Sequence, residues 1–155
     1  MVSVNTLIVA CDGSSHSARG AEYAAYFAKV TGARIHLVHA FPSTPLELIG
    51  LPGGSPHMVG VERFDEKTFR SLWDQAAKEA FKVGKAALGE AAESAETVKL
   101  SGDPAEVILE YASKQDNPMI IIGPRGMGRV REALLGSVSQ RVLHGAHCPV
   151  VLVRK

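Results

Sequence analysis

The chain has 155 residues, of which 46% are hydrophobic, and this suits one globular domain over residues 1–155 with a sizeable core. Lys+Arg 17 and Asp+Glu 16 give a formal net charge of +1, so no overall field holds nucleic acid or an anionic membrane. The only cysteines, Cys11 and Cys148, are too few for a disulfide scaffold. These features exclude a basic nucleic-acid-binding protein and a small disulfide-rich secreted protein.

The beginning of the chain shows no export signal. Residues 1–5 lack the basic region and the small-residue cleavage site of a signal peptide. No apolar run approaches the length needed to span a membrane. We therefore expect a cytoplasmic protein with reduced thiols and with neither nucleic acid nor membrane as a partner.

Strands and helices are predicted to alternate from the start. Residues 6–10 are a continuous apolar run with β-branched residues, which is typical of a strand covered on both faces. Small polar residues at 11–15 make a turn that can cap a helix running to about residue 30, and Gly32 ends that helix. Residues 34–40 form the second predicted strand.

An irregular segment follows at about residues 41–63. It holds four of the eight prolines and four glycines. Structureless loops of this length are uncommon inside compact domains and are usually lids or disordered insertions. We interpret it as a flap whose order depends on ligand, with a disordered insertion as the alternative.

The second half continues the alternation. A helix is predicted from an N-cap at Asp65 to a stop at Gly89, and a shorter helix begins with an Asp-Pro cap at residue 103. The remaining elements are strands over residues 96–100, 119–122 and 150–153 and a last helix from residue 138 to about residue 144. This order predicts an α/β fold with a parallel sheet, right-handed crossovers and helices on both faces.

A glycine-rich loop joins the fourth strand to the last helix. Its glycines at 123, 126 and 128 remove the Cβ atoms that would hold a ligand away from the main chain. We expect Gly136 to take a positive φ that feeds the helix. The amides of Ser137, Val138 and Ser139 then lie at the positive end of the helix dipole, which favours anions.

Positive side chains in the loop support a phosphate ligand, since Arg125, Arg129 and Arg131 lie within it. Two familiar phosphate motifs are excluded. A Walker A loop needs a lysine where Gly136 is followed directly by Ser137, and a dinucleotide fingerprint needs a third glycine where Arg131 stands.

The ends of the first and fourth strands define the expected site. Asp12 ends the first strand and Gly123 ends the fourth. In open parallel sheets ligands bind beyond the carboxyl ends of the strands, where the strand order reverses. If these strands are neighbours, one crevice holds both. Asp12 then serves either the helix cap or ribose hydroxyls.

Other polar residues favour structural roles. His144, His147 and Cys148 lack a second ligand pair, so no metal site is expected. Two histidines, at 36 and 39, point to opposite faces of a strand and cannot share a ligand. Ser137 and Ser139 have no base placed beside them by sequence, and we expect them to act with Gln140 in helix capping. No catalytic residue is assigned.

Several motifs together resemble the universal stress protein family over nearly the whole chain. They are Gly123-x-x-Gly126 with nine residues to Gly136-Ser137, Asp12-Gly13-Ser14, Gly102-Asp103-Pro104 and Ala146-His147-Cys148-Pro149-Val150-Val151. The resemblance implies a Rossmann-like five-stranded sheet of order 3-2-1-4-5 and a homodimer formed partly through the last strand. In the branch with the glycine motif it also implies bound ATP, or ADP or AMP, with or without Mg²⁺.

The resemblance assigns roles to residues of this sequence. Along adenine and ribose it places Ala10, Cys11, Asp12 and Ala40. Beside the ribose and the α-phosphate it places Ile122, Gly123 and Arg125. Around the phosphates it places Gly126, Gly136, Ser137, Val138 and Ser139. One departure is Pro124, where the family often has serine, so a hydroxyl and an N–H are missing there.

Three functions are compatible with these motifs. The leading one is a nucleotide-binding regulatory protein of the stress response, with at most slow ATP hydrolysis. The others are an enzyme that adenylates or hydrolyses, and a nucleotide-free protein-interaction module. The absence from the sequence of an obvious general base or paired carboxylates argues against the enzyme.

Overall fold

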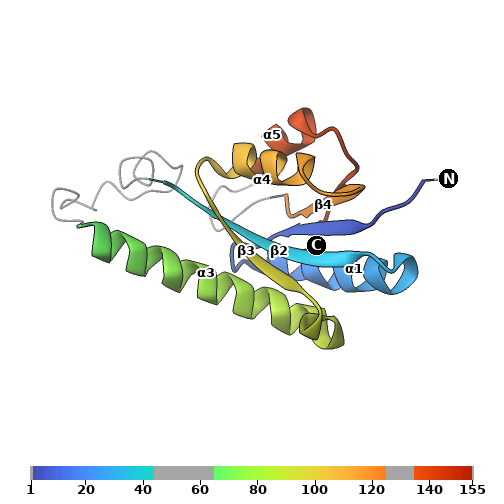
Figure 1. Ribbon diagram of the computed structural model, residues 1–155, viewed down its shortest axis with the longest axis horizontal. Coiled ribbons are helices and arrows are strands. Elements are labelled where there is room, and N and C mark those ends of the chain that lie inside the picture. The colour runs from blue at the N-terminus through green and yellow to red at the C-terminus, as the bar shows by residue number, and fades with distance from the viewer. Residues whose placement is uncertain (1, 44–64, 125–134, 155) are drawn as a thin grey trace.

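The computed structural model describes residues 2–43, 65–124 and 135–154. Its centre is a five-stranded sheet of order β3-β2-β1-β4-β5 in which every neighbouring pair is parallel (Figure 1). The strands are β1 (Thr6–Ala10), β2 (Arg34–Phe41), β3 (Glu96–Ser101), β4 (Pro118–Ile122) and β5 (Val150–Leu152). The predicted α/β fold and strand order are confirmed.

The helices cover both faces of the sheet. Helices α1 and α3 lie on one face, and α4 and α5 lie on the other (Figure 1). Their bounds are α1 (Ser15–Thr31), α3 (Glu66–Leu88), α4 (Pro104–Ser113) and α5 (Ser137–Gly145), with a short 3-10 helix η2 (Gly89–Glu93) after α3. None of the helices within the described ranges has both the length and the apolar character needed to cross a bilayer.

The predicted caps fix where three helices begin. Ser14 accepts a hydrogen bond from the Ser17 amide at α1, and Asp65 accepts one from the Thr68 amide at α3. At α4, Asp103 accepts from the Glu106 amide, and Pro104 stands in the first turn. Such caps satisfy amides that lack a partner inside the helix.

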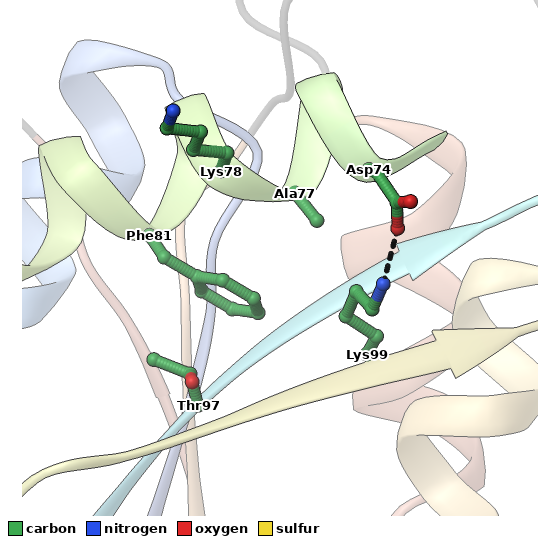
Figure 2. A pocket seen from close by; sticks show the side chains of 6 residues that line it. All are labelled: Asp74, Ala77, Lys78, Phe81, Thr97 and Lys99. Atoms are coloured by element: carbon green, nitrogen blue, oxygen red, sulfur yellow. Dashed lines mark hydrogen bonds and ion pairs between the residues drawn. The ribbon is translucent and has the colours of Figure 1, made fainter. Parts of the chain in front are cut away.

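Helix α3 lies across β2 and β3, because small residues on its inner face permit a close approach. Ala77 and Ala80 are buried there, and the Phe81 ring points toward Thr97 of β3 (Figure 2). Gly84 of this helix also fits closely, since a Cβ there would lie 3.1 Å from the Cys11 sulfur. Helix α3 thereby seals the region where β1 ends.

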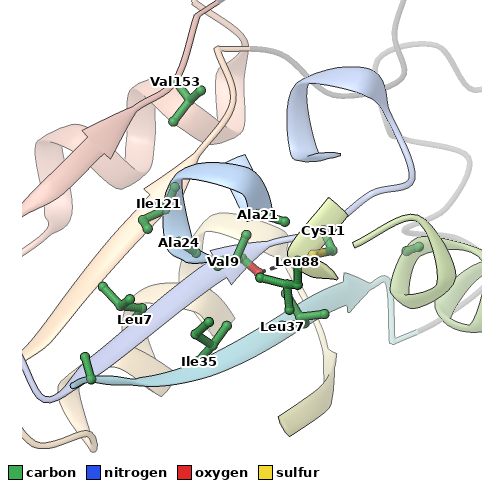
Figure 3. Close-up of a cluster of buried hydrophobic side chains, with 12 residues drawn as sticks. Leu7, Val9, Cys11, Ala21, Ala24, Ile35, Leu37, Leu88, Ile121 and Val153 are labelled. Carbon is green, nitrogen blue, oxygen red and sulfur yellow. Dashed lines mark hydrogen bonds between the residues drawn. The ribbon is translucent and has the colours of Figure 1, made fainter. Parts of the chain in front are cut away.

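The strands alternate their side chains between two apolar cores. Leu7 and Val9 of β1 join the core beneath α1 and α3 (Figure 3), while Ile8 joins the core beneath α4 and α5. Leu7, Ile8 and Val9 have no exposed surface. A central strand that is apolar on both faces is what a covered parallel sheet requires.

The boundaries differ from the prediction by single residues. β2 extends through Phe41 because it remains paired with β3 as far as Ser101. β5 ends at Leu152 instead of residue 153, and α5 begins at Ser137 instead of residue 138. The predicted flap falls almost entirely on residues 44–64, which lie outside the described residues.

Candidate functional site

The carboxyl ends of β1 and β4 lie side by side at the centre of the sheet. The two strands pair in parallel, with Val9 opposite Ile121, and β2 flanks β1 on its other side. Asp12 and Gly123 therefore follow neighbouring strands at the carboxyl end of the sheet, which is what a single crevice for both requires. The strand order reverses at this place, which is where parallel sheets bind ligands.

The turn after β1 holds Asp12 in a fixed position. Its Oδ1 accepts a 2.9 Å hydrogen bond from the Ser14 amide, and Gly13 between them has a φ of +83°. Within the described parts of the chain, the other carboxylate oxygen, Oδ2, has no hydrogen-bond partner. Asp12 therefore supports the turn with one oxygen and retains an acceptor for a ligand.

Cys11 belongs to the support of the site. Its side chain is 4% exposed in the core beneath α1 and α3, and burial raises the pKa of this thiol to about 12. Its amide donates to the Val38 carbonyl at 2.8 Å. The sulfur is thus protonated and enclosed, and it offers no nucleophile to a ligand.

His39 is a residue that the sequence interpretation classed as background. Its Nδ1 lies 2.8 Å from the Cys11 carbonyl oxygen. A carbonyl oxygen only accepts, so Nδ1 carries the proton and donates. This buried bond ties the end of β2 to the residue before Asp12. The sequence could show only that this histidine lies two residues before the end of a strand. Its acceptor, the Cys11 carbonyl, is brought to it by tertiary packing.

Gly136 corrects one expectation. It is the N-cap of α5 with φ −63° and ψ 157°, so the predicted positive φ is wrong. An N-cap residue takes extended backbone angles, whereas positive φ belongs to the residue after a helix end, as Gly32 shows with φ +74°. The capping role predicted for Ser137 with Gln140 is also wrong, because glycine occupies the cap and α5 has no side-chain cap bond.

The start of α5 presents unpartnered amides. Gly136 donates its N–H to the Pro124 carbonyl at 2.7 Å, and Gln140 donates to the Gly136 carbonyl at 3.0 Å. The three amides between them, of Ser137, Val138 and Ser139, have no acceptor among the residues that the structure describes. Three N–H groups at the positive end of a helix dipole make a suitable anion site.

Ser139 connects this helix to β4. Its hydroxyl is 2.8 Å from the Pro124 carbonyl and 2.9 Å from the Gly136 carbonyl, and the residue is 2% exposed. The hydroxyl therefore donates to the main chain. Ser139 can offer a ligand its amide, and Ser137, which is exposed, can offer both amide and hydroxyl.

Small and apolar residues line the sheet beside this helix. Ala10, Ile122 and Val138 belong to the core beneath α4 and α5, and Ala10 and Val138 are only partly buried. Ala40, also half-buried, follows Val38 on the same side of β2. Gly123, buried after β4, adds no side chain. Of these residues, Ala10, Ala40 and Val138 are small or apolar and keep some exposed surface.

Part of the predicted site lies outside the described residues. Arg125 and Gly126 belong to residues 125–134, as do Gly128, Arg129 and Arg131. In the described ranges, no group of three or more His, Cys, Asp or Glu side chains is arranged to hold a metal ion.

Arg141 was also missed by the sequence interpretation. From α5 it donates to Asp103 Oδ2 at 2.8 Å and to Glu106 Oε1 at 3.2 Å, both at the beginning of α4. Burial alone would raise the pKa of Asp103, but hydrogen bonds from Arg141 and the Glu106 amide outweigh it and lower the pKa. This contact sets the position of α5 beside α4.

The sequence matches known proteins over nearly its whole length. The model of the universal stress protein family matches residues 4–154. A universal stress protein of Thermus aquaticus is 38% identical over 149 residues, covering 96% of this chain and 98% of that protein. The universal stress protein YxiE of Bacillus subtilis is 31% identical over 153 residues, covering 97% and 99%.

Solved structures share the fold. The protein MJ0577 superposes with a TM-score of 0.76 at 22% identity, covering 99% of each chain. A universal stress protein of Archaeoglobus fulgidus in complex with dAMP has a TM-score of 0.64 at 23% identity, covering 99% and 100%. A universal stress protein in complex with cAMP has the same TM-score at 22% identity, covering 98% of each. The family model and the sequence matches show that the chain belongs to the universal stress protein family.

Proposed function

We propose that this protein binds an adenine nucleotide at the carboxyl edge of β1 and β4 and serves as an ATP-binding regulatory protein of the stress response. The observation that carries the proposal is the set of three amides at Ser137, Val138 and Ser139, beside the end of β4, which have no acceptor among the described residues. Hydrogen bonds to charged groups contribute about 1.5–3 kcal/mol each, so two or three amides together contribute a substantial part of the binding free energy of a phosphate.

The remaining contacts suit the rest of the nucleotide. The partly buried Ala10 and Ala40 leave room for a flat base, and Asp12 Oδ2 accepts from ribose hydroxyls in the proposed pose. Two relatives of the same fold bind dAMP and cAMP, which share adenine, a sugar and one phosphate. That shared part is what the described residues can hold, and residues 125–134 are assigned to the further phosphates of ATP and to any accompanying Mg²⁺.

We further propose that hydrolysis is slow at most. The buried Cys11 thiol is protonated, and the Ser139 hydroxyl is directed to main-chain carbonyls. Neither is available as a nucleophile or base toward a bound phosphate.

Assembly through β5 is proposed as well. Among the described residues β5 pairs with β4 alone and forms one edge of the sheet. Val150, Val151 and Leu152 are apolar and partly buried, and an exposed apolar edge favours association. We propose that two copies pair here in a cytoplasmic homodimer. Light scattering of the unmodified protein tests this, since Val151 also packs against the core and its replacement would alter stability.

The test of nucleotide binding has two arms. Purified protein is denatured and its supernatant examined by mass spectrometry for adenine nucleotide, and nucleotide-free protein is titrated calorimetrically with ATP, AMP, cAMP and GTP, with and without Mg²⁺. Saturable binding of an adenine nucleotide in preference to GTP supports the proposal. No co-purified nucleotide and no heat with any of the four would overturn it and favour the nucleotide-free interaction module. Phosphate release at saturating ATP measures hydrolysis.

A further inference from the structure

A shallow hollow lies between α3 and β3, on the side of the sheet away from α5. It has a volume of about 360 Å³ and is open to solvent. Figure 2 shows the side chains that line it. Its lining consists of Asp74, Ala77, Lys78, Phe81, Thr97 and Lys99. Ligand pockets start at about 300 Å³, so this hollow suits a compound of one or two rings.

The floor of the hollow is apolar. Ala77 is small and 2% exposed, and the Phe81 ring points from α3 toward Thr97 (Figure 2). The His39 ring meets the Phe81 ring edge-on, with centroids 6.2 Å apart and planes at 79°. Phe81 is therefore held from beneath, and a flat ligand can lie against it without a rearrangement of the core.

A lysine is held at one end of the hollow. The Lys99 ammonium lies 2.5 Å from Asp74 Oδ1 and 5.1 Å from the centre of the Trp73 ring. Trp73 in turn stacks on Phe41, with planes at 14°. The ion pair and the cation–π contact both restrain this amine, although its side chain is 43% exposed.

The charges of the lining favour an anion. Lys78 and Lys99 contribute two positive charges and Asp74 contributes one negative charge, which leaves +1. Lys99 already pairs with Asp74, so a cation entering the hollow gains little from that carboxylate. Lys78 extends from α3 away from Lys99 in Figure 2 and has no hydrogen-bond or ion-pair partner among the described residues.

We propose that this hollow is a second binding site, for a small planar anion such as an aromatic carboxylate of one or two rings. The ring lies on Phe81 and Ala77. The carboxylate accepts from the N–H donors of Lys99 that Asp74 does not use, since an ammonium group has three donors. The proposal does not depend on nucleotide binding at the opposite side of the sheet.

The chain provides its own reporter, because Trp73 is the single tryptophan and gives one indole N–H signal. We would titrate ¹⁵N-labelled protein with 2-naphthoate and follow that signal together with the amides of Thr97 and Lys99. All should shift together and saturate. Lys99→Met should weaken binding about two- to fivefold, as expected for a partly exposed ion pair. Thr97→Trp, which fills the hollow, should abolish it.

Matched controls make the outcome decisive. Lys82→Met removes an exposed lysine of α3 that does not line the hollow and should leave the affinity unchanged. Neutral 2-naphthamide should bind more weakly than 2-naphthoate. Shifts confined to Ser137 and Val138, no shift near Trp73, or equal affinity for 2-naphthoate and a naphthylmethylamine would each overturn the proposal. If Thr97→Trp fails to fold, the Lys99→Met and Lys82→Met pair still decides the question.

Discussion

The two serines at the start of α5 should respond to alanine substitution in opposite ways. Ser139 is buried with its hydroxyl on two carbonyls, whereas Ser137 is exposed at the first position of the helix. We expect Ser139→Ala to lower stability with little direct loss of nucleotide contacts. We expect Ser137→Ala to leave stability unchanged and to weaken the binding of adenine nucleotide.

The size of the stability change follows from which partners remain. In Ser139→Ala, the Pro124 carbonyl keeps its bond from the Gly136 amide, and the Gly136 carbonyl keeps its bond from the Gln140 amide. No buried acceptor is left without a donor, so the loss is that of one hydrogen bond, about 1 kcal/mol. For a chain of this size that corresponds to a fall of about 2–4 °C in Tm.

Urea unfolding and calorimetric titration of both variants check this pair. Loss of one hydroxyl from a phosphate in Ser137→Ala should weaken binding about ten- to a hundredfold, because hydrogen bonds to charged groups contribute about 1.5–3 kcal/mol. An unchanged midpoint for Ser139→Ala together with a large loss of nucleotide affinity would refute the assignment of its hydroxyl to the main chain. The same conclusion would follow if Ser137→Ala proved the destabilising variant.

Further predictions follow from other residues. Gly136→Val should fold, because its backbone is extended and allows β-branched residues, but the new side chain should obstruct the amides and lower ATP affinity in calorimetry. Asp12→Asn keeps an acceptor for the Ser14 amide but loses the charge, so it should reduce the preference for ATP over dATP by about ten- to a hundredfold. An equal preference in the variant and the unmodified protein would contradict a ribose contact. Cys11, whose pKa is raised to about 12, should resist iodoacetamide until the chain is unfolded in urea, as peptide mass spectrometry can show. Burial lowers the pKa of His36, which faces Glu96, Arg34 and Tyr111. The unfolded chain therefore binds more protons than the folded one, and stability should fall as the pH drops below about 6.5. In urea unfolding at several pH values, His36→Gln should reduce this dependence of stability on pH.

Much of the fold could be predicted from local sequence because the central strands β1 and β4 are apolar on both faces. Ile8 and Val9 serve different cores, and only a strand covered by helices on both sides requires that pattern. Caps such as Asp103-Pro104 were predictable for the same local reason, since the aspartate bonds an amide three residues away. Strand order came from the family resemblance, because periodicity alone carries no information about which strands are neighbours.

The site was harder to predict because its support depends on contacts between distant residues. The permissiveness of glycine at position 136 did not show which backbone region it would take. In the structure it is the N-cap of α5, has extended backbone angles and donates its N–H to the Pro124 carbonyl. Alternation along β2 correctly put His36 and His39 on opposite faces. It could not show that His39 would donate to a carbonyl 28 residues earlier in the chain.

The contacts on the two faces of the sheet position different parts of the candidate site. On the face covered by α3, Cys11 and His39 are enclosed and hold the turn that carries Asp12. On the face covered by α5, Pro124 receives Gly136 and Ser139, so the amides of α5 are fixed relative to β4. Since β1 and β4 are neighbours, the carboxylate and the amides are both anchored to the centre of one rigid sheet. A ligand that meets both therefore finds its contacts already arranged, which lowers the cost of ordering them on binding.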